Sequence, residues 1–359
     1  MKKILVTGSQ SYIGSVLTPY LVRSGYDVIG MDSGLIKDCL LYPAGDTQTI
    51  YKDVRDIKAK DLKGFGIVVY LAGISNDPFK NSDPAKVYDP VRKYTIQCAK
   101  LCKKLGIKFI FSSSCSIYGK GIKGYSDENS KVFPQTPYSL NKLQIEDDLA
   151  RITHKSFTPI ILRLATAFGL SPRMRFDLVI NMFTAMAYTS GRIILNSDGK
   201  AWRPFAHVND ICKAIKFAID FKPTQREKII LNVGATSENF QILELAKMVV
   251  REVPGCEVSF INKDVINSDI ELIKDRKIRD GVDSRNYKIS FEKIKKVFPG
   301  FEYEWTVKKG IKSMLKKFKE VNLTKEQFEN INFYRLQKLE WLIRNGYISD
   351  NLRWIKHIN

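Results

Sequence analysis

The sequence lacks the features that mark membrane and secreted proteins. No apolar run approaches the roughly 18 residues that a bilayer span needs. The apolar run near the first residue is only Ile4-Leu5-Val6, too short for the hydrophobic region of a signal peptide. We therefore expect a cytoplasmic protein that does not bind a membrane.

Metal ligands are also scarce. The chain has three histidines and six cysteines, and no two cysteines have the CxxC spacing. Cys98 and Cys102 lie four residues apart in a predicted helix and have no obvious histidine partners. Reduced thiols of a cytosolic enzyme explain this pattern, so we expect no metal site.

Acidic residues are outnumbered by basic ones. The chain has 58 Lys and Arg against 38 Asp and Glu, a net charge of +20. The excess is spread along the chain, and no homeodomain, zinc-finger or RNP pattern accompanies it. A solvated basic surface explains this charge, and we expect no nucleic-acid partner.

Short β-branched runs alternate with helical patterns through the first half of the chain. The pattern predicts strands at 3–8, 27–32, 49–52, 67–73, 109–114 and 160–166, and helices at 12–24, 85–105 and 139–155. Such alternation implies right-handed crossovers. The fold class is therefore predicted as α/β, a Rossmann-type doubly wound parallel sheet with a smaller α/β substrate lobe.

The regular alternation of strand and helix patterns ends near residue 168, which suggests a division into domains. We expect a dinucleotide-binding domain at 1–167, to which 206–222 crosses back, and a substrate lobe made of 168–205 and 223–318. Residues 319–359 form a predicted helical tail, in which Thr324 and Gln327 match a capping box. The sequence leaves open whether this tail covers the domain or forms an oligomer contact.

The first strand leads into a glycine-containing turn and a helix, the arrangement that binds a dinucleotide. Gly8 and Gly14 flank Ser11, which stands at the midpoint of a three-and-three spacing that differs from GxGxxG. Such a turn lets a pyrophosphate approach the backbone and the helix N-terminus. Asp32 ends the second strand 24 residues after Gly8, where a carboxylate accepts ribose hydroxyls and repels a 2′-phosphate. We therefore expect NAD rather than NADP.

Further cofactor contacts are expected along the same edge of the sheet. Asp53 follows the third strand, where the adenine amino group needs an acceptor, and small residues at 71–73 let the cofactor pass the fourth strand. The complete set of expected cofactor residues is Gly8, Ser11, Tyr12, Ile13, Gly14, Asp32, Ser33, Asp53, Val54, Leu71, Ala72, Gly73, Tyr138 and Lys142.

Tyr138 and Lys142 lie four residues apart, on one face of a predicted helix. A nearby ammonium stabilises a phenolate, which makes the tyrosine a usable acid and base. The helix follows a strand that ends in Ser112-Ser113-Ser114, where a hydroxyl could share the substrate oxygen with Tyr138. We predict that Tyr138 and Lys142 form a catalytic acid–base pair, which one of these hydroxyls assists.

With these motifs the chain resembles the extended short-chain dehydrogenase/reductases, and among them the NAD-dependent nucleotide-sugar epimerase/dehydratase group, which includes enzymes like UDP-galactose 4-epimerase. The resemblance covers nearly all of residues 1–320. It rests on Thr7-Gly8…Gly14, Asp32, Asp53-Val-Arg-Asp56, Leu71-Ala-Gly73, Ser114…Tyr118-Gly119, Tyr138…Lys142, Arg203…Asp210 and Asp283…Tyr287.

The resemblance implies roles for these residues. Tyr138 is the acid and base, Lys142 its partner, and Ser114 the residue that bonds the reacting sugar hydroxyl. Arg203 and Arg285 match positions that hold the nucleotide diphosphate, which a bidentate guanidinium suits. The implied substrate-binding set is Ser75, Asn76, Cys115, Ser116, Thr166, Asn181, Arg203 and Arg285.

The sequence departs from this group at several positions. Ser11 replaces a glycine, Val91 and Tyr94 stand where the group usually has Asn and Gly, and Thr166 stands where many members have Asn. Members that are 4,6-dehydratases carry Asp-Glu where this chain has Cys115-Ser116. Because elimination of water needs those acids, the pair counts against a dehydratase.

Three functions remain open. The first is a nucleotide-sugar epimerase that works at C4 through a 4-keto intermediate. The second is a C4 reductase or dehydrogenase that consumes NAD(P)(H), since the same triad serves both. The third is a cofactor-sensing or RNA-associated protein, against which Tyr138 and Lys142 argue. The resemblance also implies a homodimer formed through the helices at 85–105 and 139–155.

Overall fold

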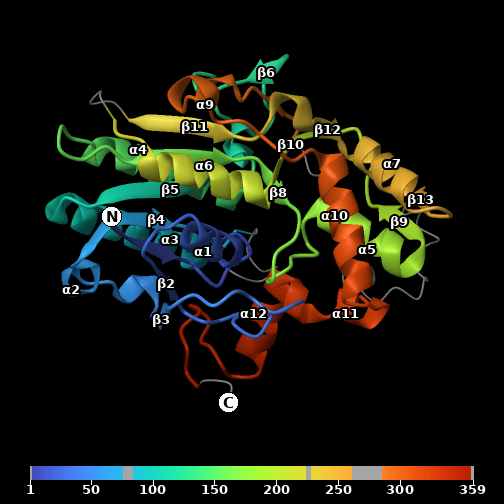
Figure 1. Ribbon diagram of the computed structural model, residues 1–359, viewed down its shortest axis with the longest axis horizontal. Coiled ribbons are helices and arrows are strands. Elements are labelled where there is room, and N and C mark those ends of the chain that lie inside the picture. Colours follow the sequence, from blue (N-terminus) through green and yellow to red (C-terminus); the bar gives the residue numbers. More distant parts are fainter. Residues whose placement is uncertain (1, 76–83, 224–227, 261–284, 357–359) are drawn as a thin grey trace.

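The computed structural model describes residues 2–75, 84–223, 228–260 and 285–356. Its centre is a seven-stranded parallel sheet with strand order β11-β7-β5-β4-β1-β2-β3 (Figure 1). The strands are β1 Lys3–Thr7, β2 Val28–Asp32, β3 Thr49–Tyr51, β4 Phe65–Tyr70, β5 Lys108–Ser114, β7 Ile160–Leu164 and β11 Ile229–Val233. The order reverses between β1 and β4, and this is the point where doubly wound sheets bind their ligands. The predicted fold class is confirmed.

Helices cover both faces of this sheet because its central strands are apolar on both sides. Ile4 and Val6 of β1 pack toward α1 (Gly14–Arg23) and α6 (Val208–Asp220). Leu5 packs on the other face, toward α3 (Pro84–Leu105) and α4 (Pro137–Ile152). Helices α3 and α4 lie side by side, and this is the helix pair through which the homodimer is predicted. The sheet between these layers is rigid, and its carboxyl edge carries the loops that form the site.

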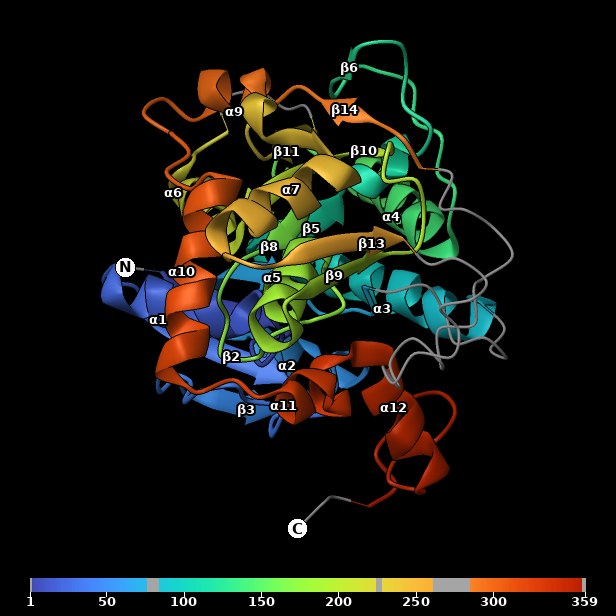
Figure 2. The ribbon, with the colours of Figure 1, turned by 90° about the vertical axis from the view of Figure 1, so that its right-hand side faces the viewer.

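A second lobe lies beside the carboxyl edge of the sheet (Figure 2). It has its own apolar core, in which α5, α7 and α10 surround Phe176, Phe183 and Phe205. Its strands are β8 Thr166–Phe168, β9 Arg192–Leu195, β10 Trp202–His207, β12 Asn239–Gln241 and β13 Glu257–Phe260, and its helices are α5 Val179–Ser190, α7 Ile242–Glu252 and α10 Val307–Glu320. Strand β14 (Lys288–Ile289) pairs with β6 (Tyr125–Ser126) above the end of β5, and helix α9 (Glu292–Val297) follows it.

Two predicted boundaries change in the structure. The return to the first domain does not end at residue 222, because β11 pairs with β7 through all five residues from Ile229 to Val233. The residues from 229 to 233 therefore belong to the dinucleotide-binding sheet and not to the substrate lobe. The predicted strand 160–166 ends at Leu164, and Thr166 already begins β8, which pairs with β10 in a different sheet.

The C-terminal residues fold back over the chain itself. Helix α11 (Lys325–Glu329) begins at the predicted capping box, in which Thr324 and Gln327 bond each other's backbone. Helix α12 (Arg335–Arg344) and the residues after it then lie against the loops that follow β2 and β3, far from α6 (Figures 1 and 2). In the structure the tail covers its own first domain, which is the first of the two arrangements that the sequence left open. Among the described residues, no helix combines the length and the apolar character of a membrane span.

Candidate active site

The turn after β1 has the shape that a pyrophosphate site requires. Gly8 has a φ of +74°, and a Cβ there would stand 2.9 Å from the backbone nitrogen of Ala72. A Cβ on Gly14 would stand 2.1 Å from the Gly8 carbonyl oxygen. Any larger residue would therefore push the turn away from the end of β4 or from the first turn of α1. The backbone is free to meet a phosphate at this point, so the turn fits the predicted dinucleotide.

Ser11 replaces the middle glycine without filling the site. Its Oγ accepts a hydrogen bond of 3.1 Å from the Gly14 N–H, inside the turn. The hydroxyl therefore stabilises the turn itself. Tyr12 has a second structural role, because its hydroxyl donates to the Gly169 carbonyl oxygen at 2.6 Å and ties the turn to the second lobe. Burial raises the pKa of Tyr12 well above its usual range, so this phenol stays protonated.

Asp32 stands at the carboxyl end of β2, as predicted for a ribose acceptor. Its two oxygens accept from the backbone N–H groups of Gln10 (3.0 Å) and Gly34 (2.8 Å). Burial raises the pKa of Asp32, and these two bonds lower it. A carboxylate has about four acceptor positions, so Asp32 keeps capacity for both hydroxyls of a ribose.

Asp53 and Val54 follow β3, beside the expected adenine position. Asp53 already accepts from the backbone N–H of Arg55 at 2.8 Å and from its guanidinium at 2.6–3.0 Å. Burial raises the pKa of Asp53, but the bonds from Arg55 outweigh it and bring the pKa below its usual range. An adenine amino group would therefore share an acceptor that Arg55 already holds in place.

The predicted triad gathers at the end of β5 and on the first turns of α4. Helix α4 begins at Pro137, and the Thr136 hydroxyl before it caps the helix. The Lys142 ammonium donates to the Ser112 carbonyl oxygen at 2.7 Å and lies 5.8 Å from the centre of the Tyr138 ring. Ser114 ends β5, and its Oγ accepts from the Ser116 N–H at 3.1 Å. Strand β5 thus carries Ser114 and helix α4 carries Tyr138 and Lys142, and the two elements are in contact.

Lys142 is buried with no carboxylate bonded to its ammonium among the described residues, and burial lowers its pKa from 10.5 to about 8. Since the folded-state pKa lies below the unfolded one, the cation destabilises the fold at neutral pH. A pKa lowered from 10.5 to about 8 corresponds to a destabilisation of about 3 kcal/mol, and loss of the bond to Ser112 would cost about 1 kcal/mol. We therefore expect Lys142→Met to stabilise the cofactor-free protein by about 2 kcal/mol at pH 7.

The pH dependence of the stabilisation by Lys142→Met tests this prediction further. Above pH 8 the wild-type Lys142 loses its proton in the folded state, so the advantage of Lys142→Met should shrink and disappear near pH 10.5. Urea unfolding at pH 7 and pH 10 measures both values. Lys104→Met, at an exposed position near the end of α3, is the control and should show no such trend. A variant that is less stable than wild type at pH 7 would contradict the prediction.

A buried polar network lies beneath the triad. Glu146, one turn after Lys142, forms an ion pair with Arg163 of β7 at 2.7 Å and accepts from the Ser113 hydroxyl. Arg163 also donates to the Tyr118 hydroxyl at 2.8 Å. This network joins α4, β5 and β7, and it therefore fixes the position of the helix that carries Tyr138.

The structure separates the predicted substrate residues into two groups. The contacts of the first group leave a role in substrate binding open. Arg203 is buried, and its Nη1 donates to the Arg285 carbonyl oxygen, so the two arginines, 82 positions apart in the sequence, meet. The Ser75 hydroxyl bonds Arg175 at 2.7 Å. Ser116 is also buried, and its hydroxyl has no partner among the described residues, so it is free for a ligand. Thr166 is partly buried at the start of β8.

The side chains of the second group are used within the protein. Cys115 is buried, and its thiol donates to the Arg163 carbonyl oxygen at 3.2 Å. Asn181 is fully buried, and its amide bonds the Gly169 N–H, the Tyr12 hydroxyl and the Arg175 carbonyl oxygen. These contacts favour structural roles for both side chains. Asn76 lies outside the described residues.

Sequence reasoning missed two arginines near the site. Arg175 pairs with Asp177 at 2.8–2.9 Å and bonds Ser75, beside the triad. Arg173 is 4% exposed and donates to the Lys37 carbonyl oxygen at 2.8 Å. The only signal in the sequence is two arginines in Ser171-Pro-Arg-Met-Arg175, and surface loops often carry such pairs. Within the described ranges, no group of three or more His, Cys, Asp or Glu side chains is arranged to hold a metal ion.

Other proteins share this arrangement. A family model described as the NAD dependent epimerase/dehydratase family matches residues 4–234. A Bacillus subtilis protein described as an uncharacterised UDP-glucose epimerase is 27% identical over 265 residues, which are 69% of this chain and 81% of that protein.

Two solved structures are similar to this chain. One is a NAD-dependent NDP-hexosamine 5,6-dehydratase of tunicamycin biosynthesis, with a TM-score of 0.74 and 18% identity over 89% of this chain and 98% of that one. The other is UDP-glucuronic acid 4-epimerase from Bacillus cereus with UDP-glucuronic acid and NAD, with a TM-score of 0.72 and 22% identity over 89% of this chain and 99% of that one.

The Rossmann sheet and the family match define the class of this protein, an NAD-dependent enzyme, in which the turn after β1 and Asp32 are the predicted pyrophosphate and ribose sites. The match over residues 4–234 narrows the class: the chain belongs to the NAD-dependent epimerase/dehydratase family. The family resemblance and the NAD cofactor that the sequence predicted are confirmed. The roles of the individual site residues stay predictions.

Proposed function

We propose that this protein is a nucleotide-sugar epimerase that inverts C4 of its sugar through a 4-keto intermediate. The observation that carries the proposal is the position of Lys142, which bonds the Ser112 carbonyl oxygen in β5 and lies 5.8 Å from the centre of the Tyr138 ring, while Ser114 ends the same strand. Relatives described as UDP-glucose epimerases support it.

Each residue of the triad has a distinct role in this proposal. When bound, NAD supplies the redox chemistry by accepting a hydride from C4 and returning it. The Tyr138 phenolate takes the proton of the 4-hydroxyl and later returns it to the same oxygen. Ser114 donates a hydrogen bond to that oxygen and keeps it aligned. Lys142 places a positive charge near the phenolate and a donor near the cofactor ribose.

Arg203 and Arg285 would hold the diphosphate of the substrate. Arg203 comes from β10 and Arg285 from the residues just before β14, and the contact between them places both at one end of the second lobe. A guanidinium bonds a phosphate through two parallel N–H groups. Because the sugar must turn to present its other face, an anchor on the diphosphate would keep the nucleotide bound during that rotation.

A reductase or dehydrogenase acting at C4 is the second candidate, because the same three residues serve a net oxidation or reduction. A 4,6-dehydratase is less well supported, since Cys115 and Ser116 stand where the elimination needs acids and Cys115 is buried. The likeness to a 5,6-dehydratase does not alter this conclusion, because at 18% identity it concerns the fold alone.

One experiment separates the two leading candidates. The purified protein is passed through gel filtration and then mixed with UDP-glucose, UDP-arabinose or UDP-glucuronic acid without added cofactor. An epimerase retains NAD and converts one of these sugars to its C4 epimer, which NMR detects. A protein that loses NAD and reacts only with stoichiometric NAD(H) is an oxidoreductase, and the epimerase proposal would be abandoned.

Cofactor preference follows from Asp32. A 2′-phosphate would meet the buried carboxylate, so we expect NAD to bind at least tenfold more tightly than NADP in calorimetry. Asp32→Ala should weaken NAD by about 10–100-fold, the loss of hydrogen bonds to a charged group, and should affect NADP much less. Asp38→Ala, in the loop after β2, is the control. Equal affinity of the wild-type protein for both cofactors would contradict the assignment.

A further inference from the structure

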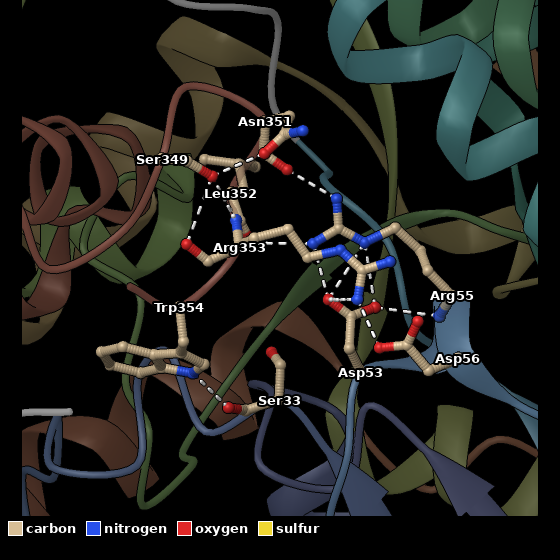
Figure 3. A network of polar contacts seen from close by, with 9 residues as sticks. All are labelled: Ser33, Asp53, Arg55, Asp56, Ser349, Asn351, Leu352, Arg353 and Trp354. Atoms are coloured by element: carbon tan, nitrogen blue, oxygen red, sulfur yellow. Dashed lines mark hydrogen bonds and ion pairs between the residues drawn. The ribbon is translucent and has the colours of Figure 1, made fainter. Parts of the chain in front are cut away.

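The segment from Arg335 to Lys356 lies outside the part of the chain that the family model matches, which ends at residue 234. It consists of α12 and a return to the first domain, and it contacts the loops that follow β2 and β3 (Figure 3). We call it the C-terminal strap. Its contacts are with the loops in which the cofactor site is predicted.

An apolar contact attaches the strap on both sides of the β1 turn. Leu339, Leu342 and Ile348 are buried in a small core of their own, against Leu35 and Ile74. Leu35 follows β2 and Ile74 follows β4, and the two strands flank β1 in the sheet. The strap therefore bridges the crevice in which a dinucleotide crosses such a sheet.

A polar contact attaches the strap at the adenosine end of that crevice (Figure 3). Arg55 donates to the carbonyl oxygens of Asn351 (2.5 Å) and Leu352 (2.8 Å). The indole N–H of Trp354 donates to the Ser33 carbonyl oxygen at 2.6 Å. Ser33 adjoins the ribose carboxylate, so the strap holds the loop after β2 in place.

The same contact includes the predicted adenine acceptor. Arg353 lies 3.5 Å from Asp53 and forms an ion pair with Asp56 (Figure 3). Arg55 joins both ends of the network, because it holds Asp53 as well as the strap carbonyls. Movement of the strap would therefore change the acceptor that the adenine needs.

The strap also brings charge to the crevice. Arg335 lies near Arg175, and burial together with this repulsion lowers the pKa of Arg335 to about 10. Arg173 approaches Asp32 from the second lobe, and its Nε and Nη1 are buried without a partner among the described residues. Asp177 is already paired with Arg175. Arg173 is thus a buried guanidinium with two unpartnered donors among the described residues, and Arg335 is a half-buried one at the start of α12; such groups favour a bound anion.

We propose that the C-terminal strap is a wall of the cofactor site and that Arg335 and Arg173 bind the diphosphate of NAD. The diphosphate lies between the ribose at Asp32 and the nicotinamide at the triad, the stretch of the crevice that these two arginines approach. This proposal rests on the NAD cofactor and not on the reaction at C4, so its test needs no sugar substrate.

The test measures binding of NAD, ADP and adenosine to the full-length protein by calorimetry. Arg335→Met and Arg173→Met should each weaken NAD and ADP by about 10–100-fold, the loss of a charged hydrogen bond. Adenosine lacks the diphosphate, and its affinity should stay within about twofold. Arg344→Met, an exposed position at the other end of α12, is the matched control. Wild-type affinity for NAD in both variants would overturn the proposal, and tighter binding would show that the strap blocks the site.

A second measurement uses only the wild-type protein. If the strap is a wall of the site, bound NAD should slow tryptic cleavage after Arg353 at least fivefold, whereas adenosine should protect it less. Mass spectrometry identifies the cleaved bond. Cleavage that NAD leaves unchanged or accelerates would overturn the proposal, even if the arginine variants failed to fold.

Discussion

Tyr138→Phe should lower kcat by about 10²–10⁴-fold, the range that loss of a general acid and base produces. In the proposed mechanism the phenol carries the substrate proton, while Lys142 is bonded to the Ser112 carbonyl oxygen and supplies the positive charge. Affinity for NAD should change little, since the ring remains. Turnover of the sugar nucleotide, measured by NMR under saturation, gives the loss.

Two comparisons make this result specific. Ser114→Ala should cost less than Tyr138→Phe, because it removes one hydrogen bond and leaves the proton carrier. Tyr20→Phe, on α1 and away from the triad, should leave kcat unchanged. If Tyr138→Phe turned over at the wild-type rate on a confirmed substrate, the triad would have no catalytic role and the proposed mechanism would have to be discarded.

Glu146→Gln should lower the free energy of unfolding by about 3–5 kcal/mol, the cost of leaving a buried charge without its partner. Glu146 and Arg163 are 2% and 5% exposed, and their guanidinium and carboxylate groups meet at 2.7 Å. The amide cannot neutralise Arg163, and it also changes the bond from the Ser113 hydroxyl. Urea unfolding monitored by circular dichroism measures the loss.

The double variant Glu146→Met/Arg163→Met tests whether the charge is the cause. Because both ions are then absent, it should recover much of the stability that the single variant loses. Asp148→Asn, also on α4, removes partly exposed ion pairs with Arg92 of α3 and with Arg151, and it should cost less than about 1 kcal/mol. Equal losses in Glu146→Gln and Asp148→Asn would contradict the role assigned to the buried network.

The local pattern of the sequence was enough to predict most of the sheet. Continuous apolar runs such as Ile4-Leu5-Val6 indicate strands that are buried on both faces, and this holds wherever the strand lies in the sheet. The pyrophosphate turn and Asp32 were also predictable, because they follow directly from the strands that carry them. Tyr138 and Lys142 share a helix, so their spacing alone placed them on one face.

Other features depend on contacts between residues far apart in the sequence. Asn181 has the same amide whether it binds a sugar or bonds Gly169 and Tyr12, and only the packing of the second lobe decides between them. The strand at 229–233 has no local signal that assigns it to the main sheet, since its partner β7 lies about 70 residues earlier.

The sequence by itself was enough to predict the class of fold, the glycine turn after β1 and the shared helix of Tyr138 and Lys142, because each depends on residues close together in the chain. The tertiary structure decided where the basic C-terminal residues go. Arg353 and Trp354 carry no pattern that names their partners, and they meet Asp56 and Ser33 only after about 300 intervening residues have folded. Contacts of that range depend on how whole domains pack, and no local periodicity records them.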